Sequence, residues 1–326
     1  MKELMKYFLA TQMVAIIKQI KVAPRYVYDK YFAKSKEPKL SPSVQIPIYK
    51  GSGVILESVS EEGEHLIQDS GDKFLIDLTI PRFPLEKTNT SAELNQISAL
   101  DGKKEQIETL SQKVGQILTE HKNSFLTTLE FMATGALFGK VVDGKGKTLF
   151  EFKSTSTPIV SKSGVTLIEI LNSIDEKLEE ELGYIPPYEI LASRSYINGI
   201  ATLAKEEELF KNNNAKWEEV DGRRVLIVHG KKFVPYSAAY KNTKGVTKKF
   251  LEDNKAIVTP FAPEVYKTYY SRANHTEALK MAPKMFFAAT PEKLGKGKGY
   301  VLVSEMRAIP ICVRPGALIN LEYQAS

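Results

Sequence analysis

The sequence predicts an α+β protein built around one long helix. Three observations carry this prediction: an uninterrupted helical pattern from Lys103 to Phe138, strand patterns on both sides of it, and alternating helix and strand patterns from Gly164 to Ala289. Of the 326 residues, 43% are hydrophobic and 26% are charged, which is typical of a soluble globular protein. This length allows two or three compact regions.

Charge and cysteine content narrow the class of protein. The net charge is +6 and the pI is about 9.0, a mild excess that tolerates nucleic acid nearby without establishing contact. Cys312 is the only cysteine, so the chain forms no internal disulfide and a reducing compartment is expected. No apolar run approaches the length of a membrane span. We therefore expect a soluble intracellular protein.

The first twenty residues resemble a signal peptide only superficially. Gln12 interrupts the apolar run, and no small-residue cleavage site follows before Lys18. The apolar residues instead share one face of a helix: Leu4, Phe8, Met13, Ile16, Ile17 and Ile20. The segment therefore predicts an amphipathic helix.

An aromatic segment and an extended segment follow this helix. Prolines are expected to keep residues 37–48 extended. Aromatic rings exposed at such density need a partner surface that covers them. The arm therefore supplies four candidate subunit-interface residues: Tyr26, Tyr28, Tyr31 and Phe32.

Residues 51–84 predict two strands joined by an acidic turn at Glu61-Glu62-Gly63-Glu64, with Pro81 and Pro84 closing the second strand. A two-stranded ribbon alone is marginally stable in water, so it is expected to lie on its own subunit or on a neighbour. Alternation places four apolar residues on one face of the returning strand, and these are further interface candidates: Phe74, Ile76, Leu78 and Ile80.

The long helix has apolar residues at steps of three and four: Ile107, Leu110, Val114, Ile117, Leu118, Phe125, Leu129, Met132 and Ala136. Gly139 stands where a C-terminal glycine is expected to end it. A helix of this length spans roughly 50 Å, about three times an ordinary globular helix. His121 lies near the apolar stripe, where we expect it to pack or to face a partner.

Residues 139–145 come close to a phosphate-binding loop. Gly146 stands where a serine or threonine would hold a metal ion, and the helix precedes the loop instead of following it. A hairpin that turns at Asp143-Gly144 is the favoured interpretation. We predict no nucleotide site here.

The region from Gly164 to Ala289 predicts a small α/β unit, followed by terminal strands. The α/β unit is expected to begin with a helix from Leu167 that ends near Gly183, followed by a strand Tyr188–Ala192 and a helix Ser193–Lys205. A buried strand Val225–Val228 is then expected to pair with Phe233–Tyr236 across His229-Gly230. The terminal strands are expected at Tyr300–Ser304 and Ala317–Tyr323.

Motifs for catalysis or metal binding are missing from the sequence. The four histidines (His65, His121, His229 and His275) lack metal-ligand spacing. The chain has no Gly-x-Ser-x-Gly elbow and no dinucleotide fingerprint, and Cys312 lies in an apolar run where we expect it to be buried and inert. We predict no catalytic residue, no cofactor and no metal, although residues that converge only in the fold could still form a site.

Lysines gather between Lys231 and Lys255 and interleave with aromatic residues. Such a pattern could form a nucleic-acid surface through charge and stacking. A hairpin with a solvated basic turn at residues 242–245 is favoured, because no nucleic-acid-binding motif frames the patch. The lysines concerned are Lys231, Lys232, Lys241, Lys244, Lys248, Lys249 and Lys255.

The order of these elements, together with three motifs, resembles a tailed-phage major capsid protein, in particular the family typified by the phage lambda major head protein (major capsid protein E family). The motifs are Tyr26–Phe32 followed by Val44–Pro47, the stretch Gly245–Val258, and the closing segment Ile309–Ile319 with its Arg314-Pro315 turn. The weakest match is Lys205–Asp221, which offers only a polar insertion around Trp217.

This resemblance implies the HK97-like (Hong Kong 97) phage capsid fold. Residues 1–50 would be the N-arm and 51–87 the extended loop (E-loop). Residues 88–163 and 299–326 would form the peripheral domain, which includes the spine helix 103–138, and residues 164–298 the axial domain. The arm and the ribbon would adhere to adjacent subunits, because neither buries enough of itself to be stable alone.

The same resemblance implies a structural function without catalysis. The chain would be the major capsid subunit that self-assembles into hexamers and pentamers of an icosahedral head enclosing double-stranded DNA. Scaffold and portal proteins would be partners, a decoration protein is left open, and packaged DNA would be touched non-specifically. The protein would be assembled in the host cytoplasm and reside in the virion.

Three alternatives follow from the same sequence. An encapsulin-type compartment shell shares the fold but needs a cargo-docking groove near the N-terminus, and the long aromatic arm argues against it. A DNA-binding protein using the hairpin 231–255 predicts a monomer or dimer whose DNA affinity collapses when those lysines become glutamate. An enzyme without a recognisable motif is the third.

Overall fold

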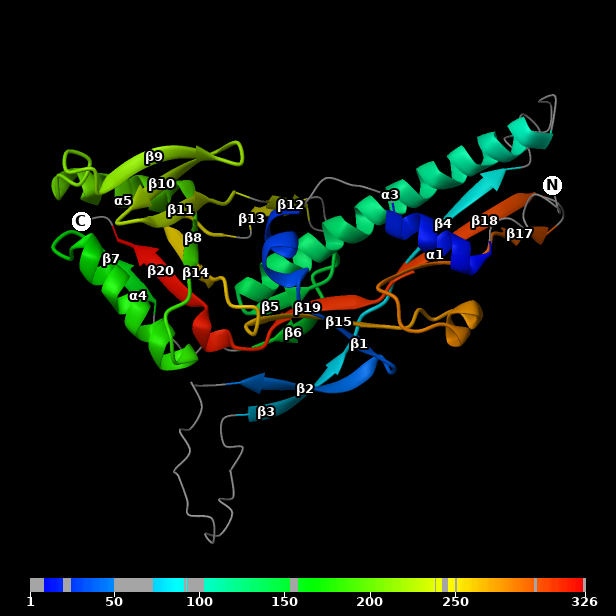
Figure 1. The fold of residues 1–326 in the computed structure, drawn as a ribbon, viewed down its shortest axis with the longest axis horizontal. Helices are drawn as coiled ribbons and strands as arrows, with labels where there is room; N and C mark the ends of the chain where they lie inside the picture. The colour runs from blue at the N-terminus through cyan, green and yellow to red at the C-terminus, as the bar shows by residue number, and fades with distance from the viewer. Residues whose placement is uncertain are drawn as a thin grey trace, which may run out of the picture. The chain divides into compact units, whose positions relative to one another are not determined.

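The computed structural model describes residues 9–19, 25–49, 73–90, 92, 103–152, 158–237, 239–241, 246–249, 251–295 and 298–324. The chain forms two compact units (Figure 1). Unit 1 comprises Met1–Val44, Asp77–Ala133 and Thr268–Ile311. Unit 2 comprises Gln45–Ile76, Thr134–Lys267 and Cys312–Ser326.

The long helix α3 (Lys103–Leu137) confirms the central prediction. Its apolar stripe is buried wherever the side chains are described: Leu110, Val114, Ile117, Leu118, Phe125, Leu129, Met132 and Ala136. Gly139 follows the helix with a φ of +80°, a conformation that glycine adopts without strain. His121 is packed inside unit 1, with Nδ1 3.0 Å from the Ser304 hydroxyl, and burial lowers the pKa of its imidazole.

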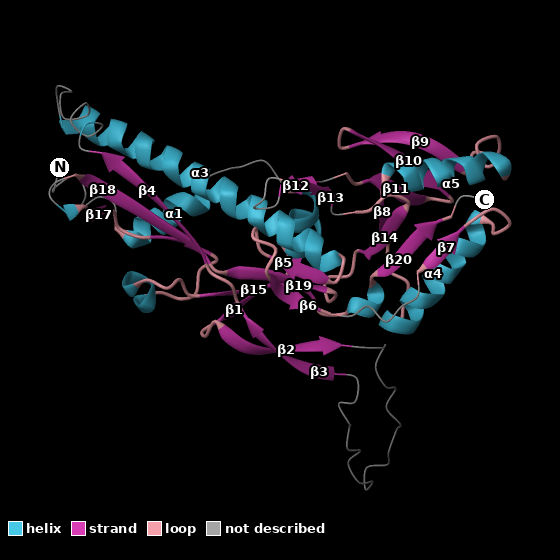
Figure 2. Ribbon diagram, turned by 180° about the vertical axis from the view of Figure 1, so that it is seen from behind, coloured by secondary structure: helices cyan, strands magenta, loops and turns pink. Residues whose placement is uncertain are grey.

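A four-stranded antiparallel sheet runs along the part of α3 in unit 1 (Figures 1 and 2). Its central strand β18 (Gly299–Met306) pairs with β16 (Phe286–Ala288) and β17 (Glu292–Lys293) on one side. On the other side it pairs with β4 (Phe83–Thr90) over the full length of both strands. Helix α1 (Ala10–Gln19) lies against β16.

Strand β4 is a finding that the sequence did not predict. Pro81 and Pro84 were expected to end the preceding strand, but Pro84 lies inside β4. β4 is an edge strand, the position in a sheet where proline is tolerated, because alternate backbone groups of an edge strand have no ladder partner. At the far end of the pairing, Gly299 has a φ of +131°, and a Cβ there would lie 2.0 Å from the carbonyl oxygen of Asn89. Only glycine fits.

The N-terminal arm contains both helical and extended parts. The predicted amphipathic helix is confirmed over α1, where Met13, Val14 and Ile17 are buried. A one-turn π-helix η2 (Tyr28–Phe32) follows, which was not predicted. The expected extended part forms β1 (Lys36–Lys39) and β2 (Ser43–Tyr49).

These arm strands belong to two small sheets. Strand β1 pairs in parallel with β15 (Tyr266–Ser271), which neighbours β19 (Ala308–Cys312). Strand β2 pairs with β3 (Lys73–Thr79) in a two-stranded sheet. The expected first ribbon strand around residues 54–56 and the acidic turn at 61–64 lie outside the described residues.

Unit 2 is organised around a mixed seven-stranded sheet. In spatial order its strands are β7 (Ile159–Ser161), β20 (Ile319–Tyr323), β14 (Lys255–Pro260), β8 (Tyr188–Ala192), β11 (Lys231–Pro235), β10 (Arg223–Val228) and β9 (Ala215–Val220). The pairs β7–β20 and β8–β11 are parallel. Helix α5 (Arg194–Glu206) contacts β20, β14, β11 and β10, and α4 (Leu167–Leu182) contacts α5 and β7.

Local signals define the ends of α4 in unit 2. Gly183, at a φ of +80°, ends the helix as predicted, and a capping box between Thr166 and Glu169, which was not predicted, begins it. The two-residue turn His229-Gly230 joins β10 to β11, and both residues have positive φ. Strand β9 was missed, because the polar residues of this edge strand hid its pattern.

Two hairpins complete unit 2. Strands β5 (Lys140–Val142) and β6 (Thr148–Glu151) confirm the hairpin interpretation of the glycine-rich stretch. Oδ1 of Asp143 accepts the backbone N–H of Lys145 and Lys147 at 2.8 and 2.9 Å, so the loop satisfies its own donors. Strands β12 (Ala239–Lys241) and β13 (Thr247–Lys249) also pair, while the turn at 242–245 lies outside the described residues.

Two short 3-10 helices, η3 (Thr276–Lys280) and η5 (Pro315–Ala317), lie in unit 1 and unit 2 respectively. The compact units group the segments differently from the four expected regions: residues 268–298 fall in unit 1, and β20 joins the sheet of unit 2. The four regions were defined by positions in a shell, and they stay a prediction.

Over the described ranges, no helix combines the length and apolar character needed to span a membrane.

Candidate subunit interface

The aromatic helix of the arm is held against α3 by one carboxylate. The backbone N–H groups of Val27 and Tyr28 donate to Oε1 and Oε2 of Glu130 at 3.0 and 2.8 Å. N–H groups at the start of a helix have no intrahelical acceptor, so Glu130 caps η2 from a neighbouring element. Burial raises the pKa of Glu130, and the two backbone hydrogen bonds oppose this shift.

Three of the four arm rings are buried in the chain itself. Tyr28, Tyr31 and Phe32 are 1%, 4% and 0% exposed. The Tyr28 hydroxyl donates to Sδ of Met285 at 3.4 Å, and Thr268 donates to the carbonyl oxygen of Phe32 at 3.1 Å. The expected exposure of these three rings is therefore wrong, because unit 1 covers them. Their contact with a second subunit stays a prediction.

The fourth ring, Tyr26, is half-buried. Its hydroxyl accepts a hydrogen bond from Lys30 Nζ at 3.0 Å, and the same ammonium lies 4.7 Å from the ring centroid. Tyr26 is therefore the arm candidate with the most ring surface still open to solvent.

The ribbon candidates follow a gradient along β3. Leu78 and Ile80 are 2% and 1% exposed, Ile76 is half-buried, and Phe74 is 57% exposed. Asp77 and Thr79, on the other face, are exposed. The predicted alternation is confirmed from Ile76 onward, and the apolar face loses its cover toward the beginning of the strand.

Both faces of the ribbon are apolar where β3 begins. Leu75, which points away from the Phe74 face, is 61% exposed. The ribbon is anchored by backbone hydrogen bonds from Ile80 to Pro42 and from Tyr49 to Val313, both 2.8 Å. The two exposed side chains therefore stand on a held strand, and they form the ribbon patch (Phe74 and Leu75).

Unit 2 carries a second exposed apolar group that sequence reasoning missed. Tyr184, Ile185 and Phe261 are 45%, 46% and 40% exposed. Tyr184 and Ile185 lie in the connection between α4 and β8, and Phe261 directly follows β14. The backbone N–H of Phe261 donates to the carbonyl oxygen of Pro187 at 2.7 Å, which joins the two segments. The hydroxyl of Tyr184 donates to Glu264. The available signal was the pair of bulky residues directly before Pro186-Pro187.

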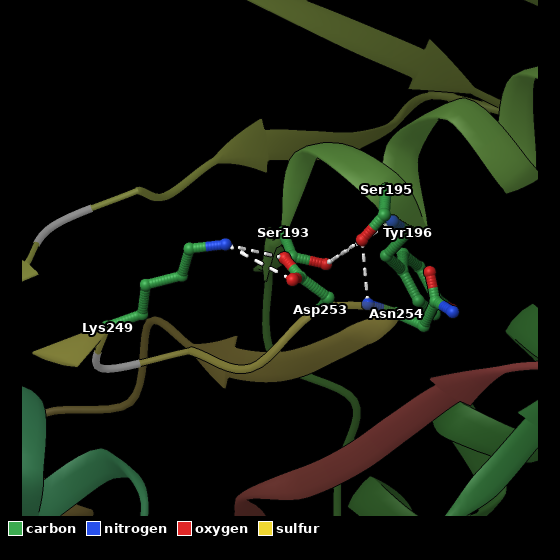
Figure 3. Close-up of polar contacts among 6 residues, drawn as sticks. All are labelled: Ser193, Ser195, Tyr196, Lys249, Asp253 and Asn254. Carbon is green, nitrogen blue, oxygen red and sulfur yellow. Dashed lines mark hydrogen bonds and ion pairs between the residues drawn. The ribbon is translucent and has the colours of Figure 1, made fainter.

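A polar cluster at the start of α5 is the strongest candidate for chemistry among the hydroxyl groups (Figure 3). Ser193 accepts the N–H of Tyr196 at 3.3 Å and so caps the helix. Its hydroxyl lies 3.2 Å from that of Ser195, which accepts the N–H of Asn254 at 2.7 Å.

The basic group in this cluster faces a carboxylate instead of a serine. Nζ of Lys249 donates to both oxygens of Asp253 at 2.9 and 3.2 Å, as Figure 3 shows. A serine nucleophile needs an adjacent base, whereas these hydroxyls contact each other and the backbone. The cluster is thus arranged as a helix cap and a loop junction.

Three of the lysines in residues 231–255 have carboxylate partners: Lys231, Lys249 and Lys255. Lys231 lies 3.7 Å from Asp175 and 3.9 Å from the centroid of the Tyr188 ring. Lys255 pairs with Glu252 at 2.6 Å, and Lys249 pairs with Asp253 as above. These pairs neutralise three of the seven lysine charges on which a nucleic-acid surface would depend, and this favours the solvated-hairpin interpretation.

The remaining candidates for chemistry lie in packing environments. Cys312 is fully buried, and burial raises the pKa of its thiol far above the usual range. Nδ1 of His275 accepts the N–H of Glu277 at 3.3 Å, a helix cap. Within the described part of the chain, no three His, Cys, Asp or Glu side chains are placed to hold a metal ion.

Comparisons with known proteins identify the fold and the family. The model of the phage major capsid protein E family matches residues 10–322. The chain is similar to the protein assigned as a prophage capsid protein of E. coli CFT073, with a TM-score of 0.59 and 11% identity over 97% of this chain and 99% of that chain.

Two further solved structures are similar at lower TM-scores. The SrpI encapsulin of Synechococcus elongatus PCC 7942 has a TM-score of 0.48 and 10% identity over 93% of this chain and 88% of that chain. The mature capsid of bacteriophage PhiM1 has a TM-score of 0.46 and 12% identity over 94% and 90%. No curated protein matches the sequence.

The expected fold class is confirmed as α+β of the HK97-like capsid type. The family model spans both compact units and includes the arm helix, α3 and the terminal strands. The chain therefore belongs to the phage major capsid protein E family and is a structural protein of a phage capsid.

Proposed function

We propose that the chain is the major subunit of a tailed-phage or prophage head. In this proposal copies of the chain form hexamers and pentamers of an icosahedral shell around double-stranded DNA. The family match over residues 10–322 is the observation that carries the proposal. The role is structural and has no catalytic step, and the shell is assembled in the host cytoplasm and becomes part of the virion.

Each expected region receives a mechanical role in this proposal. The N-arm 1–50 and the extended loop 51–87 join neighbouring subunits, residues 88–163 and 299–326 form the peripheral domain, and residues 164–298 form the axial domain. The ribbon patch supports the adhesive role of the loop, because its two apolar side chains are exposed on an otherwise anchored strand. The buried stripe of α3 supports a rigid spine.

Partners of the proposed shell follow from its assembly. Scaffold and portal proteins would act during head formation, and a decoration protein would bind the finished shell where one is present. Packaged DNA would meet the inner surface through screened, sequence-independent contacts that the net charge of +6 favours.

Electron microscopy and sedimentation of the purified full-length chain test the proposal. We expect closed shells, capsomer rings or curved sheets, alone or with co-expressed scaffold. Nuclease-protected DNA inside shells from infected or induced cells would support a phage head, whereas shells that hold a protein cargo and no DNA would indicate a compartment. A particle that stays small under all these conditions would contradict the proposal.

A further inference from the structure

Unit 1 contains a cavity of about 480 Å³, part of whose wall is formed by the arm. Its walls come from α1, η2, β1, α3, β15 and the segment that enters β16. The volume lies in the range of small-molecule sites in proteins. Apolar and aromatic side chains form much of the lining: Val14, Tyr28, Leu126, Tyr270, Pro283, Met285 and Phe286.

The charged side chains that line the cavity are mostly basic. Four lysines line the cavity: Lys18, Lys36, Lys122 and Lys284. Asp29 is the carboxylate among the lining residues, and its Oδ2 already accepts the Arg25 backbone N–H at 2.7 Å. With one carboxylate against four ammonium groups, the lining carries a charge of +3.

Lys122 is the most deeply placed of these lysines. It is 8% exposed, and its Nζ donates to the carbonyl oxygen of Lys18 at 3.1 Å. Burial lowers the pKa of Lys122, and the neighbouring Lys36 lowers it further. Burial also lowers the pKa of Lys36. Placing like charges close together costs free energy, most of all for the buried Lys122, and an anion in the cavity would offset that cost.

The chemistry of the lining distinguishes among anions. A carboxylate brings one negative charge, whereas a phosphate monoester brings nearly two on one compact group with three acceptor oxygens. One phosphate can therefore bind several of the ammonium groups that line the cavity, each of which is a point donor. The aromatic and apolar wall offers a surface on which a flat heterocycle can stack.

We propose that this cavity is a binding site for a phosphorylated ligand of nucleotide size, whose phosphate lies among Lys18, Lys36, Lys122 and Lys284 and whose base lies against the apolar wall. Such a ligand is either a free nucleotide or the phosphorylated end of a nucleic-acid strand. The site joins α1 and the arm to α3 within unit 1, so an occupied cavity would stabilise the arm.

Calorimetric titration of the unassembled full-length chain with AMP, ATP, adenosine and inorganic phosphate tests this site. We expect AMP and ATP to bind at one site per chain, inorganic phosphate to bind more weakly, and adenosine to give no signal. Higher salt should weaken nucleotide binding, because the attraction is between charges. Equal binding of adenosine and AMP, or no binding of either nucleotide, would overturn the proposal.

Variants locate the site and separate binding from folding. Lys36→Met and Lys122→Met should each weaken AMP binding about tenfold, since each removes a charged hydrogen-bond donor, and Lys36→Arg should retain most of the affinity. Lys216→Met, a surface lysine of unit 2 that pairs with Glu218, is the matched control. Circular dichroism and thermal melting without ligand confirm that each variant is folded. A loss that is equal in the control would overturn the assignment.

Two further ligands distinguish the source of the phosphate and the class of partner. Binding of a 5′-phosphorylated DNA oligonucleotide, but not of its 5′-hydroxyl counterpart, would support a strand end, and binding of nucleotides alone would support a free nucleotide. A synthetic peptide of residues 57–68, which contains the acidic turn, is the competing anion. Displacement of AMP by this peptide at lower concentration than by ATP would overturn the phosphate site in favour of a peptide site.

Discussion

The arm helix η2 and the ribbon strand β3 carry similar apolar residues, but those of η2 are buried and those at the start of β3 are exposed to solvent. Phe32 is fully buried in unit 1, while Phe74 is 57% exposed. Around η2, Glu130 binds two backbone N–H groups and Thr268 binds the Phe32 carbonyl oxygen, so several elements hold the rings in place. Phe74 stands at the beginning of a two-stranded sheet.

The contrast separates two uses of an apolar residue in a shell protein. The arm rings belong to the core, so their removal should lower the unfolding free energy of the single chain. Removal of the ribbon patch should change only the association between copies. Variants at each place test this division, and their expected effects on the unfolding free energy of the unassembled chain decrease from the arm rings to the ribbon patch.

Phe32→Ala should have the largest effect. Removing a fully buried phenylalanine costs about 3–5 kcal/mol through lost burial and the cavity that remains. Urea unfolding of the unassembled chain measures it, with Phe74→Ala as the matched control, which should change the unfolding free energy by less than about 0.5 kcal/mol. Equal losses in the two variants would break the comparison.

Glu130→Gln should lower the unfolding free energy by about 1–3 kcal/mol, because an amide offers one acceptor where the carboxylate offers two. The folded chain raises the pKa of Glu130, so it binds a proton more readily than the unfolded chain does. The contribution of this group to stability is therefore greatest below about pH 4.3 and decreases as the pH rises toward the raised pKa.

The pH dependence gives this prediction a second readout. Urea midpoints of the wild type and of Glu130→Gln should be compared from pH 4 upward. The part of the decrease in urea midpoint with rising pH that comes from Glu130 should be missing in the variant. A variant that reproduces the slope of the wild type would show that Glu130 does not titrate in this window.

Tyr26→Phe should cost about 0.5–1 kcal/mol or less. The change removes the hydroxyl that accepts from Lys30 but keeps the ring. Because only one hydrogen bond at a half-buried position is lost, the decrease should be smaller than those of Phe32→Ala and Glu130→Gln. Chemical denaturation against the wild type measures it, and a loss as large as that of Glu130→Gln would show that the hydroxyl contributes more than this one hydrogen bond.

Phe74→Thr with Leu75→Thr should have the smallest effect on folding and a clear effect on assembly. Threonine retains strand propensity, and both replaced side chains are exposed, so the unfolding free energy should change by less than about 0.5 kcal/mol. Electron microscopy and sedimentation should then show fewer shells or capsomers. Thr79→Ser on the exposed face of the same strand is the control, and normal assembly of the double variant would remove the ribbon patch from the interface.

Much of the fold could be predicted because its signals are local. The stripe of α3, the glycine that ends α4, the strand Tyr188–Ala192 and the turn at His229-Gly230 depend on residues close together in the sequence. Strand β4 was missed because it exists through its pairing with β18, which lies far away in the sequence. Strand β9 was missed for a different reason: its partner β10 follows directly after the turn Asp221-Gly222, but the polar residues of β9 hid the strand pattern.

The candidate interface shows the same division within a single set of residues. By itself, the sequence determined the fold class, the spine helix and the alternation of β3, because side-chain periodicity is set by backbone geometry. Only the tertiary structure decided that Tyr28, Tyr31 and Phe32 are covered and that Phe74 is not. Burial depends on which distant segments arrive at a side chain, and four lysines from separate elements likewise meet around one cavity only after the chain has folded.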